Sequence, residues 1–82
     1  MADAIEKEII SIISDVSGYE PEEIKPETHL ANELEIDSIK AIEITVAIEK
    51  KFKISIRDED VPNIVTLKDA IGLVRNLISQ KD

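Results

Sequence analysis

Asp37 and Ser38 stand side by side, directly before a run of residues with helical spacing. Aspartate is a preferred N-cap residue, because its carboxylate oxygen accepts a hydrogen bond from backbone N–H groups that have no partner inside the helix. Ser38 is then expected in the first turn, where free N–H groups and the positive end of the helix dipole stabilise a phosphate. The pair therefore favours a phosphodiester on Ser38, although a serine in this position is also common helix-start chemistry.

The rest of the chain offers little for catalysis by that serine. His29 is the single histidine, and there is no cysteine. The spacing supports neither a Ser-His-Asp nor a Ser-Lys arrangement, so no base is available to activate the hydroxyl. We therefore predict that the protein is not an enzyme, and we expect His29 to be a surface or hydrogen-bonded loop residue.

Three aspartates have a spacing that resembles a calcium-binding loop. Asp58, Asp60 and Asp69 occupy the first, third and twelfth places of an EF-hand-like sequence. Pro62 and Asn63 stand where such a loop needs a flexible residue and a glycine. We therefore predict a solvated acidic turn and no metal site.

The helix that follows Ser38 has two apolar stripes. At about 100° per residue, one stripe gathers within a single arc and is predicted to face the core: Ala41, Ile44, Ile48 and Phe52. The other lies roughly opposite by the same geometry, and consists of Ile39, Ile42 and Val46. Single exposed apolar residues are ordinary, and a loop can cover such a stripe. The interpretation we favour is an accessible ridge for partner docking, with an acidic rim of Glu35, Glu43 and Glu49.

The remaining pattern predicts an all-α fold. A first helix is expected from Asp3 to Ser17, with Gly18 as its stop. A long loop through Pro21 and Pro26 to about Ile36 follows, with an anchoring set of Ile24, Leu30 and Leu34 and a short turn over residues 31–34. The second helix is expected to begin at Asp37 and to end near Lys51.

The last third of the chain is predicted to contain a loop and one clear helix. Phe52, Ile54 and Ile56 alternate with polar residues, and without a partner strand we read them as a loop that buries three side chains. Pro62 restricts residues 58–63 to a short helix at most. The final helix is predicted from Thr66 to Ile78, with a capping box formed by Thr66 and Asp69 and an apolar face of Leu67, Ala70, Ile71, Val74, Leu77 and Ile78. Gly72 is expected to permit close packing, and residues 79–82 are expected to fray.

Composition and charge limit the partners. The 82 residues suit one domain spanning 1–82, and their formal net charge of −8 repels nucleic-acid phosphates and anionic lipid. No stretch approaches the roughly 18 apolar residues of a membrane span, and the first ten residues lack the pattern of a secretion signal. We therefore expect a cytoplasmic monomer that binds no nucleic acid and does not insert into a membrane.

These features together resemble an acyl carrier protein, the small acidic domain that bears 4'-phosphopantetheine on the serine of an Asp-Ser-Leu motif. The resemblance runs through most of the chain: the first helix ending at Gly18, residues 21–24, residues 30–34 leading into Asp37-Ser38-Ile39, residues 41–44 and 47–49, Phe52, Ile56 and residues 65–67. It implies an acyl-carrier-like bundle of three long helices and one short helix, with a long loop between the first two. It also implies that Ser38 is the modified residue and that Asp37 assists a phosphopantetheinyl transferase of the holo-ACP-synthase type through a magnesium ion.

The resemblance further implies how such a carrier meets its partners and cargo. Ile39, Ile42 and Val46 match an apolar ridge that acyl-transferring and synthase enzymes contact, and Glu43 matches an acidic contact. An acyl chain carried for fatty acid, polyketide or related biosynthesis would shelter among Ile44, Ile48, Ile56, Ile64 and Leu67, which are equally suited to be plain core.

Two departures from the family pattern concern the same region. Glu35 stands where glycine is common, and Ile39 replaces the leucine after the serine. Lys40, Lys50 and Lys51 replace acids and dilute the negative stripe of the helix, which puts docking to standard fatty acid enzymes in question. The alternative from another class is an unmodified acidic helical adaptor, in which Ser38 only begins a helix.

Overall fold

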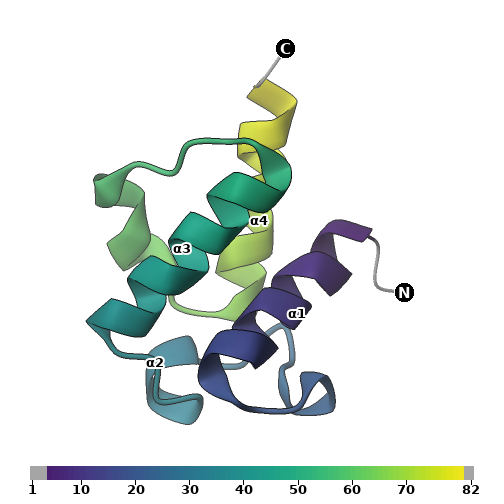
Figure 1. The fold of residues 1–82 in the computed structure, drawn as a ribbon, viewed down its shortest axis with the longest axis vertical. Coiled ribbons are helices and arrows are strands. Elements are labelled where there is room, and N and C mark those ends of the chain that lie inside the picture. The colour runs from purple at the N-terminus through teal and green to yellow at the C-terminus, as the bar shows by residue number, and fades with distance from the viewer. Residues whose placement is uncertain (1–3, 81–82) are drawn as a thin grey trace.

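The structure, a computed structural model, describes residues 4–80, and the regular elements of that part of the chain are all helical, without a named strand (Figure 1). Its elements are α1 (Ala4–Ser17), η1 (Pro21–Glu23), α2 (Leu30–Glu33), α3 (Ser38–Phe52), η2 (Asp58–Asn63) and α4 (Leu67–Gln80). The predicted all-α class is confirmed. The one short helix expected from the sequence corresponds to η2, and the long loop between α1 and α3 contains two further short helical segments, η1 and α2.

The three long helices enclose one aliphatic core. α1 packs against both α3 and α4, and Figure 1 shows α1 running beside α3 in the opposite direction. The most deeply buried side chains come from all three helices and are Ile9, Ile13, Ile48, Leu67 and Val74. With few aromatic residues available, branched aliphatic side chains fill the space between helices.

The long loop between α1 and α3 is tied down at both ends. Gly18 has a φ of +83° and its N–H bonds to the Ser14 carbonyl at 2.9 Å, which ends α1 as predicted. Farther along, the N–H of Leu30 donates to Val65 O at 2.9 Å, and that of Lys68 donates to Pro26 O at 2.9 Å. The predicted anchors Ile24, Leu30 and Leu34 are all buried. The long connection is stable because its two short helical segments, its buried side chains and its backbone hydrogen bonds to the start of α4 hold it in place.

α4 begins at the predicted capping box. Thr66 Oγ1 accepts from the N–H of Asp69 at 3.2 Å, and Asp69 Oδ2 accepts from the N–H groups of Thr66 and Val65 at 3.1 Å each. These backbone bonds, the one from Thr66 first, hold the pKa of Asp69 below its ordinary value, because they favour the ionised carboxylate. The helix continues through Gln80, so Ser79 and Gln80 are helical and the prediction of a tail frayed from residue 79 is wrong for these two. Residues 81 and 82, like Asp3 at the other end, lie outside the described part.

Two further predictions need correction. Gly72 is exposed, and a Cβ built there would meet no atom within 4 Å, so close packing does not explain this glycine. Of the three alternating apolar residues at and after the end of α3, only Ile56 is buried, while Phe52 and Ile54 are partly exposed and pack against the edge of the core. The alternation overstated their burial because these residues lie at the end of a helix and in a loop, where side chains have no fixed inward face.

Pro62 lies inside η2, which stays a six-residue 3₁₀ segment. This agrees with the prediction that any helix here is short, since proline lacks the N–H that a longer α-helix would need.

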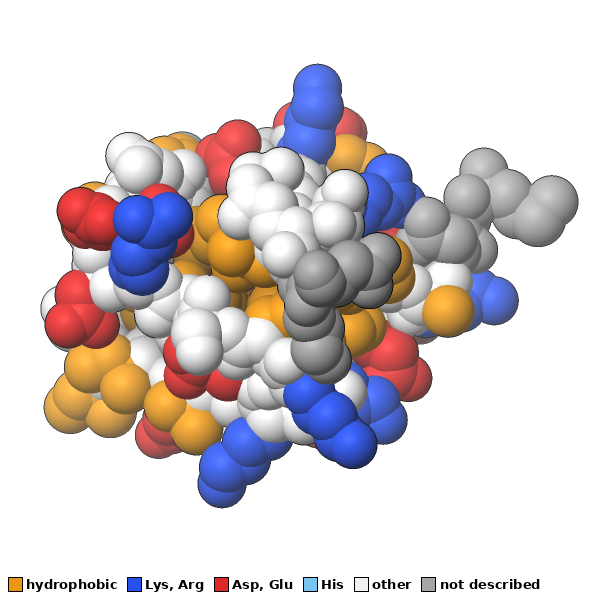
Figure 2. Space-filling model, turned by 90° about the horizontal axis from the view of Figure 1, so that it is seen from above, with side chains coloured by type: hydrophobic (Ala, Val, Ile, Leu, Met, Phe, Trp, Pro, Cys, Tyr) orange, Lys and Arg blue, Asp and Glu red, His pale blue; other side chains and the backbone are white. Residues whose placement is uncertain are grey.

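Charged side chains of both signs cover much of the surface. Figure 2, which views the end where α4 finishes, shows acidic and basic side chains interspersed around exposed hydrophobic ones. Among the residues that the structure describes, no helix combines the length and apolar character needed to cross a membrane.

Candidate functional site

The Asp37-Ser38 pair forms the start of α3. Asp37 is the N-cap in an extended conformation, and its Oδ1 accepts from the N–H of Lys40 at 2.9 Å. The Asp37 carbonyl accepts from the N–H of Ala41 at 2.9 Å, which closes the first turn. The predicted capping role of Asp37 is therefore confirmed, and the cap uses one of its two carboxylate oxygens.

Ser38 is the first helical residue, and its side chain is exposed. The first N–H groups of a helix have no carbonyl partner within it, so the helix end offers donors and a positive dipole to an anion on this hydroxyl. The site therefore fits a phosphodiester: the hydroxyl is accessible and the local field favours negative charge.

Glu35 adopts a left-handed backbone conformation just before this pair. Its φ of 55° lies in the region that glycine enters without steric cost, which matches the departure noted in the sequence. The Tyr19 hydroxyl donates to Glu35 Oε2 at 3.2 Å. This hydrogen bond, followed by the negative charge of Glu35, raises the pKa of Tyr19. Glu35 is thus connected to the start of the loop that follows α1 through a side-chain contact that the sequence did not indicate.

The second apolar stripe of α3 is open to solvent. Its exposed fractions are 68% at Ile39, 60% at Ile42 and 41% at Val46. We call these three residues the exposed ridge. No loop of the described chain covers it, so the explanation that a loop hides the stripe does not hold for this structure.

The acidic rim expected beside the exposed ridge is uneven. Glu43 is exposed, as a contact to a partner would require. Glu49 is half-buried, and its Oε2 accepts from the N–H of Ile56 at 2.8 Å, so its carboxylate also organises the loop after α3. Lys51 forms a 3.0 Å ion pair with Glu8 of α1, on the side of α3 that meets its own fold. A partner role for Glu35, Glu43 and Glu49 remains a prediction.

The lone histidine has a structural partner. His29 is the N-cap of α2, where Nδ1 accepts from the N–H of Asn32 at 3.2 Å and its own N–H donates to Glu33 Oε2 at 2.7 Å. This is the hydrogen-bonded loop residue that the sequence predicts.

The three aspartates with calcium-like spacing do not converge. Asp69 caps α4, while Asp60 forms a 3.9 Å ion pair with Arg57. Within residues 4–80, no three His, Cys, Asp or Glu side chains lie close enough together to hold a metal ion.

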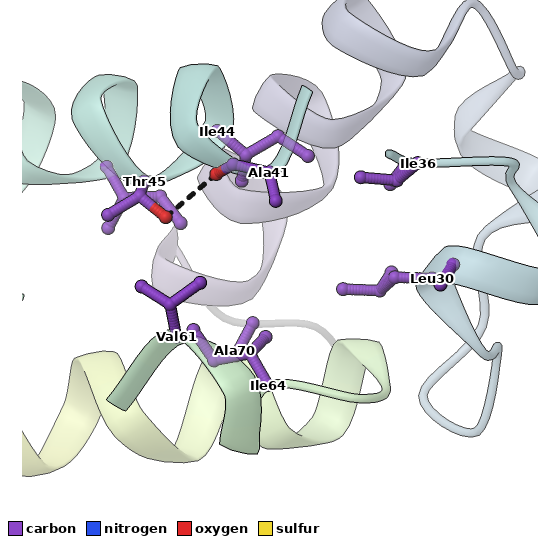
Figure 3. A pocket seen from close by; sticks show the side chains of 10 residues that line it. Leu30, Ile36, Ala41, Ile44, Thr45, Val61, Ile64 and Ala70 are labelled. Carbon is purple, nitrogen blue, oxygen red and sulfur yellow. Dashed lines mark hydrogen bonds between the residues drawn. The ribbon is translucent and has the colours of Figure 1, made fainter. Parts of the chain in front are cut away.

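A small apolar cavity of about 100 Å³ lies between α3 and the segment that leads from η2 into α4 (Figure 3). Side chains of α3 point into it from one side, those of η2 and α4 from the other, and Leu30 and Ile36 close one end. Its lining residues are Leu30, Ala31, Ile36, Ala41, Ile44, Thr45, Ile48, Val61, Ile64 and Ala70.

Three of the five residues proposed from the sequence as an acyl pocket, Ile44, Ile48 and Ile64, line this cavity. Ile56 and Leu67 do not; both are buried in the core instead. The sequence missed the residues contributed by α2, η2 and the loop before α3, because only the packing of distant segments brings them together. The one feature of the sequence that could have indicated them is the long loop, because its apolar anchoring residues had to pack against some part of the helix bundle.

A shallow surface groove lies beside Ser38 and adjoins this cavity. Its lining residues are Ser38, Ala41, Ile42, Asp58, Val61 and Pro62. Ala41 and Val61 line both the groove and the cavity. The Ser38 side chain therefore faces a groove that is separated from the cavity by no more than the side chains of Ala41 and Val61.

Comparisons with known proteins agree on one family. The family described as "Phosphopantetheine attachment site" matches residues 7–74, which include Asp37 and Ser38. The acyl carrier protein of Nitratidesulfovibrio vulgaris is 37% identical over 73 residues, which cover 89% of this chain and 96% of that protein.

Mycobacterial relatives are similar to the same degree. The meromycolate extension acyl carrier protein of Mycolicibacterium smegmatis is 37% identical over 78 residues, covering 90% of this chain and 79% of that protein. The protein of the same name from Mycobacterium tuberculosis is 39% identical over 69 residues, covering 84% of this chain. The chain matches only 60% of the length of that relative.

Proposed function

This chain belongs to the acyl carrier protein family, and we propose that it carries acyl groups as thioesters on a 4'-phosphopantetheine arm attached to Ser38. The observation that supports this most directly is the exposed serine on the first turn of α3, next to the exposed ridge and to a surface groove that adjoins the apolar cavity. The covalent 4'-phosphopantetheine group defines this family, and its terminal thiol supplies the thioester chemistry. The protein itself acts as a carrier and not as a catalyst.

The residues around Ser38 each have a role in this proposal. In a reaction catalysed by a phosphopantetheinyl transferase, the Ser38 hydroxyl oxygen would lose its proton and bond to the phosphorus that bears the pantetheine group of coenzyme A, while the pyrophosphate bond breaks and adenosine 3',5'-bisphosphate leaves. The N-terminus of α3 stabilises the resulting phosphodiester by its dipole and its free N–H groups. Asp37 holds the first turn through Oδ1 and presents the rest of its exposed carboxylate to the transferase and its metal ion.

The exposed ridge is proposed as the surface that partner enzymes bind. A contiguous apolar surface with a charged rim is typical of protein–protein interfaces. Glu43 would supply the electrostatic part of that contact, so binding should weaken as the salt concentration rises. The acyl-transferring and synthase enzymes, the monomeric state and the cytoplasmic location predicted from the sequence remain part of this proposal. The names of the relatives favour acyl over aminoacyl cargo.

The attachment site is tested by mass spectrometry. Incubation of the purified chain with coenzyme A and a phosphopantetheinyl transferase of broad specificity should add the mass of one phosphopantetheine group. Ser38→Ala should abolish the gain, whereas the control Ser55→Ala, which removes an exposed hydroxyl from the loop after α3, should keep it. Modification of the Ser38→Ala variant would refute the site, and an unmodified wild-type chain would favour the adaptor.

The role of Asp37 is tested by separating its cap from its charge. Asparagine is as good an N-cap as aspartate, whereas alanine loses the cap. Asp37→Asn should therefore keep the stability of the fold but slow the transfer to Ser38 at least about tenfold, the range expected for a ligand contact near a catalytic metal ion. A normal rate in Asp37→Asn would show that Asp37 acts only as a cap.

A further inference from the structure

The cavity beside α3 contains one hydroxyl among apolar side chains. Of the described residues that line it, Thr45 is the polar one, and all the others are alanine, valine, leucine or isoleucine. Thr45 Oγ1 donates to the carbonyl of Ala41 at 2.8 Å, as Figure 3 shows. A threonine hydroxyl has one proton and two acceptor lone pairs. With its proton directed to Ala41, the oxygen is available as an acceptor toward the cavity.

We propose that the cavity binds a short acyl chain that carries a hydroxyl group, of the 3-hydroxyacyl class, and that Thr45 determines this preference. The proposal rests on the proposed function, since it concerns the group attached at Ser38. It adds a chemical class of cargo and one residue that selects it.

The size of the cavity sets the length of the chain. An apolar cavity of about 150 Å³ holds benzene, which has six carbon atoms. By that measure the observed cavity of about 100 Å³ accommodates about four carbon atoms. A hydroxyl that reaches Thr45 must therefore be carried within the first few carbons of the acyl chain.

The hydrogen-bonding capacity of Thr45 determines which functional group on the acyl chain is favoured. A hydroxyl on the cargo loses its bonds to water when it enters an apolar cavity, and this is unfavourable unless it finds a partner. The Thr45 oxygen accepts that hydrogen bond without giving up its own bond to Ala41 O. A 3-oxo group offers only an acceptor, so it would bond to Thr45 only after the Thr45 proton left the Ala41 carbonyl. A saturated chain gains apolar burial but no hydrogen bond.

The path from Ser38 agrees with this assignment. Thr45 lies seven residues after Ser38 on α3, which is roughly 10 Å along the helix axis. The groove beside Ser38 shares Ala41 and Val61 with the cavity, so the two adjoin along the side of α3 that carries Ala41 and Thr45. The arm attached at Ser38 therefore enters on the same side of α3 as the hydroxyl.

The test loads the wild-type chain and the Thr45→Val variant with three four-carbon groups. A phosphopantetheinyl transferase is supplied with butyryl-, 3-hydroxybutyryl- or 3-oxobutyryl-coenzyme A, and mass spectrometry verifies each product. The melting temperature of each loaded protein is then measured. Valine has nearly the shape of threonine, so the variant removes the hydroxyl and keeps the cavity filled.

In the wild type, the 3-hydroxybutyryl form should melt higher than the butyryl form by roughly 4 to 8 °C, the shift expected for one added buried hydrogen bond in a domain of this size. The 3-oxobutyryl form should show no such gain. In Thr45→Val the advantage of the 3-hydroxybutyryl form should disappear, whereas Ser55→Ala, a hydroxyl removed outside the cavity, should retain it.

Two results would overturn the inference. Equal melting temperatures of the 3-hydroxybutyryl and butyryl forms in the wild type would show that Thr45 does not select the cargo, as would an unchanged difference in Thr45→Val. These outcomes leave the proposed function intact, because loading at Ser38 is verified beforehand by mass. If no group can be loaded, the proposed function fails and this inference fails with it.

Discussion

The two sides of α3 carry the same residue type in opposite environments. Ile44 and Ile48 are 7% and 2% exposed, whereas Ile39 and Ile42 are 68% and 60% exposed. The buried pair packs into the core shared with α1 and α4, and the exposed pair forms most of the ridge beside Ser38. The contrast shows that side-chain chemistry alone does not assign a role on this helix. Burial separates the isoleucines that stabilise the fold from those available to a partner.

The two halves of α3 also differ in their contacts. The start of α3 contains the Asp37 cap, Ser38 and the open groove, while Glu49 and Lys51 near its end bond to the following loop and to α1. The first half is therefore accessible on one side, and the second half is fastened to the rest of the fold. An exposed ion pair such as Lys51–Glu8 contributes little stability by itself. The buried apolar contacts of Ile44 and Ile48 therefore contribute more to the stability of this region than the ion pair does.

The largest effect should come from truncating the buried side. Ile48→Ala removes a side chain that is 2% exposed, and such changes cost about 2 to 5 kcal/mol of unfolding free energy, because lost burial and a residual cavity add together. The matched change Ile42→Ala on the exposed ridge should stay within about 0.5 kcal/mol of the wild type. Urea unfolding followed by circular dichroism measures both. Equal losses would contradict the division between the two sides.

For binding to the transferase, we expect the substitution on the exposed ridge to have the larger effect and the one on the buried side the smaller. Ile42→Ala should lower kcat/KM for the modification of Ser38 by roughly five- to thirtyfold, because a central apolar contact in an interface is worth about 1 to 2 kcal/mol. Ile48→Val is the matched change on the buried side; it costs about 0.5 to 1.5 kcal/mol of stability but should leave kcat/KM unchanged while the protein is folded. An equal effect of both variants on kcat/KM would place the partner surface elsewhere.

The smallest expected effect is on the pH dependence of stability, and it comes from Asp69 at the start of α4. The pKa of Asp69 is lowered in the folded protein by hydrogen bonds from the Thr66 and Val65 backbone, so its stabilising contribution is complete above the unfolded pKa and is lost as pH falls through the folded value. Stability should therefore decline below about pH 4, and Asp69→Asn should show less of this acid-dependent decline. Unfolding midpoints measured at pH 7 and pH 3 test this. An identical decline in both proteins would show that other carboxylates cause it.

Most of the fold could be predicted because local patterns and core burial agree. The apolar spacing in α1, α3 and α4 marks the sides that are buried, and Gly18, Asp37 and Thr66 mark helix ends through backbone hydrogen bonds that depend on nearby residues alone. The errors occur where the pattern is short. The alternation at Phe52, Ile54 and Ile56 predicted equal burial, but a loop has no repeating geometry to impose it.

In the candidate site, too, the features on a single helix could be predicted and those formed by several segments could not. Ser38, Asp37 and the exposed ridge lie on one helix, so the helical period relates them without knowledge of any other segment. The cavity is different, because Leu30, Val61 and Ala70 come from separate elements. Their meeting depends on how the long loop and η2 fold back onto α3.

The sequence by itself therefore determined the helices, their caps and the presence of two apolar sides on α3, since each follows from interactions over a few residues. Only the tertiary structure decided which isoleucines remain open to solvent, that Ile56 and Leu67 belong to the core and not to the cavity, and that Thr45 brings a hydroxyl into an apolar space. These outcomes depend on packing between segments that are distant in the chain, and the volume left between them is not encoded in any local pattern.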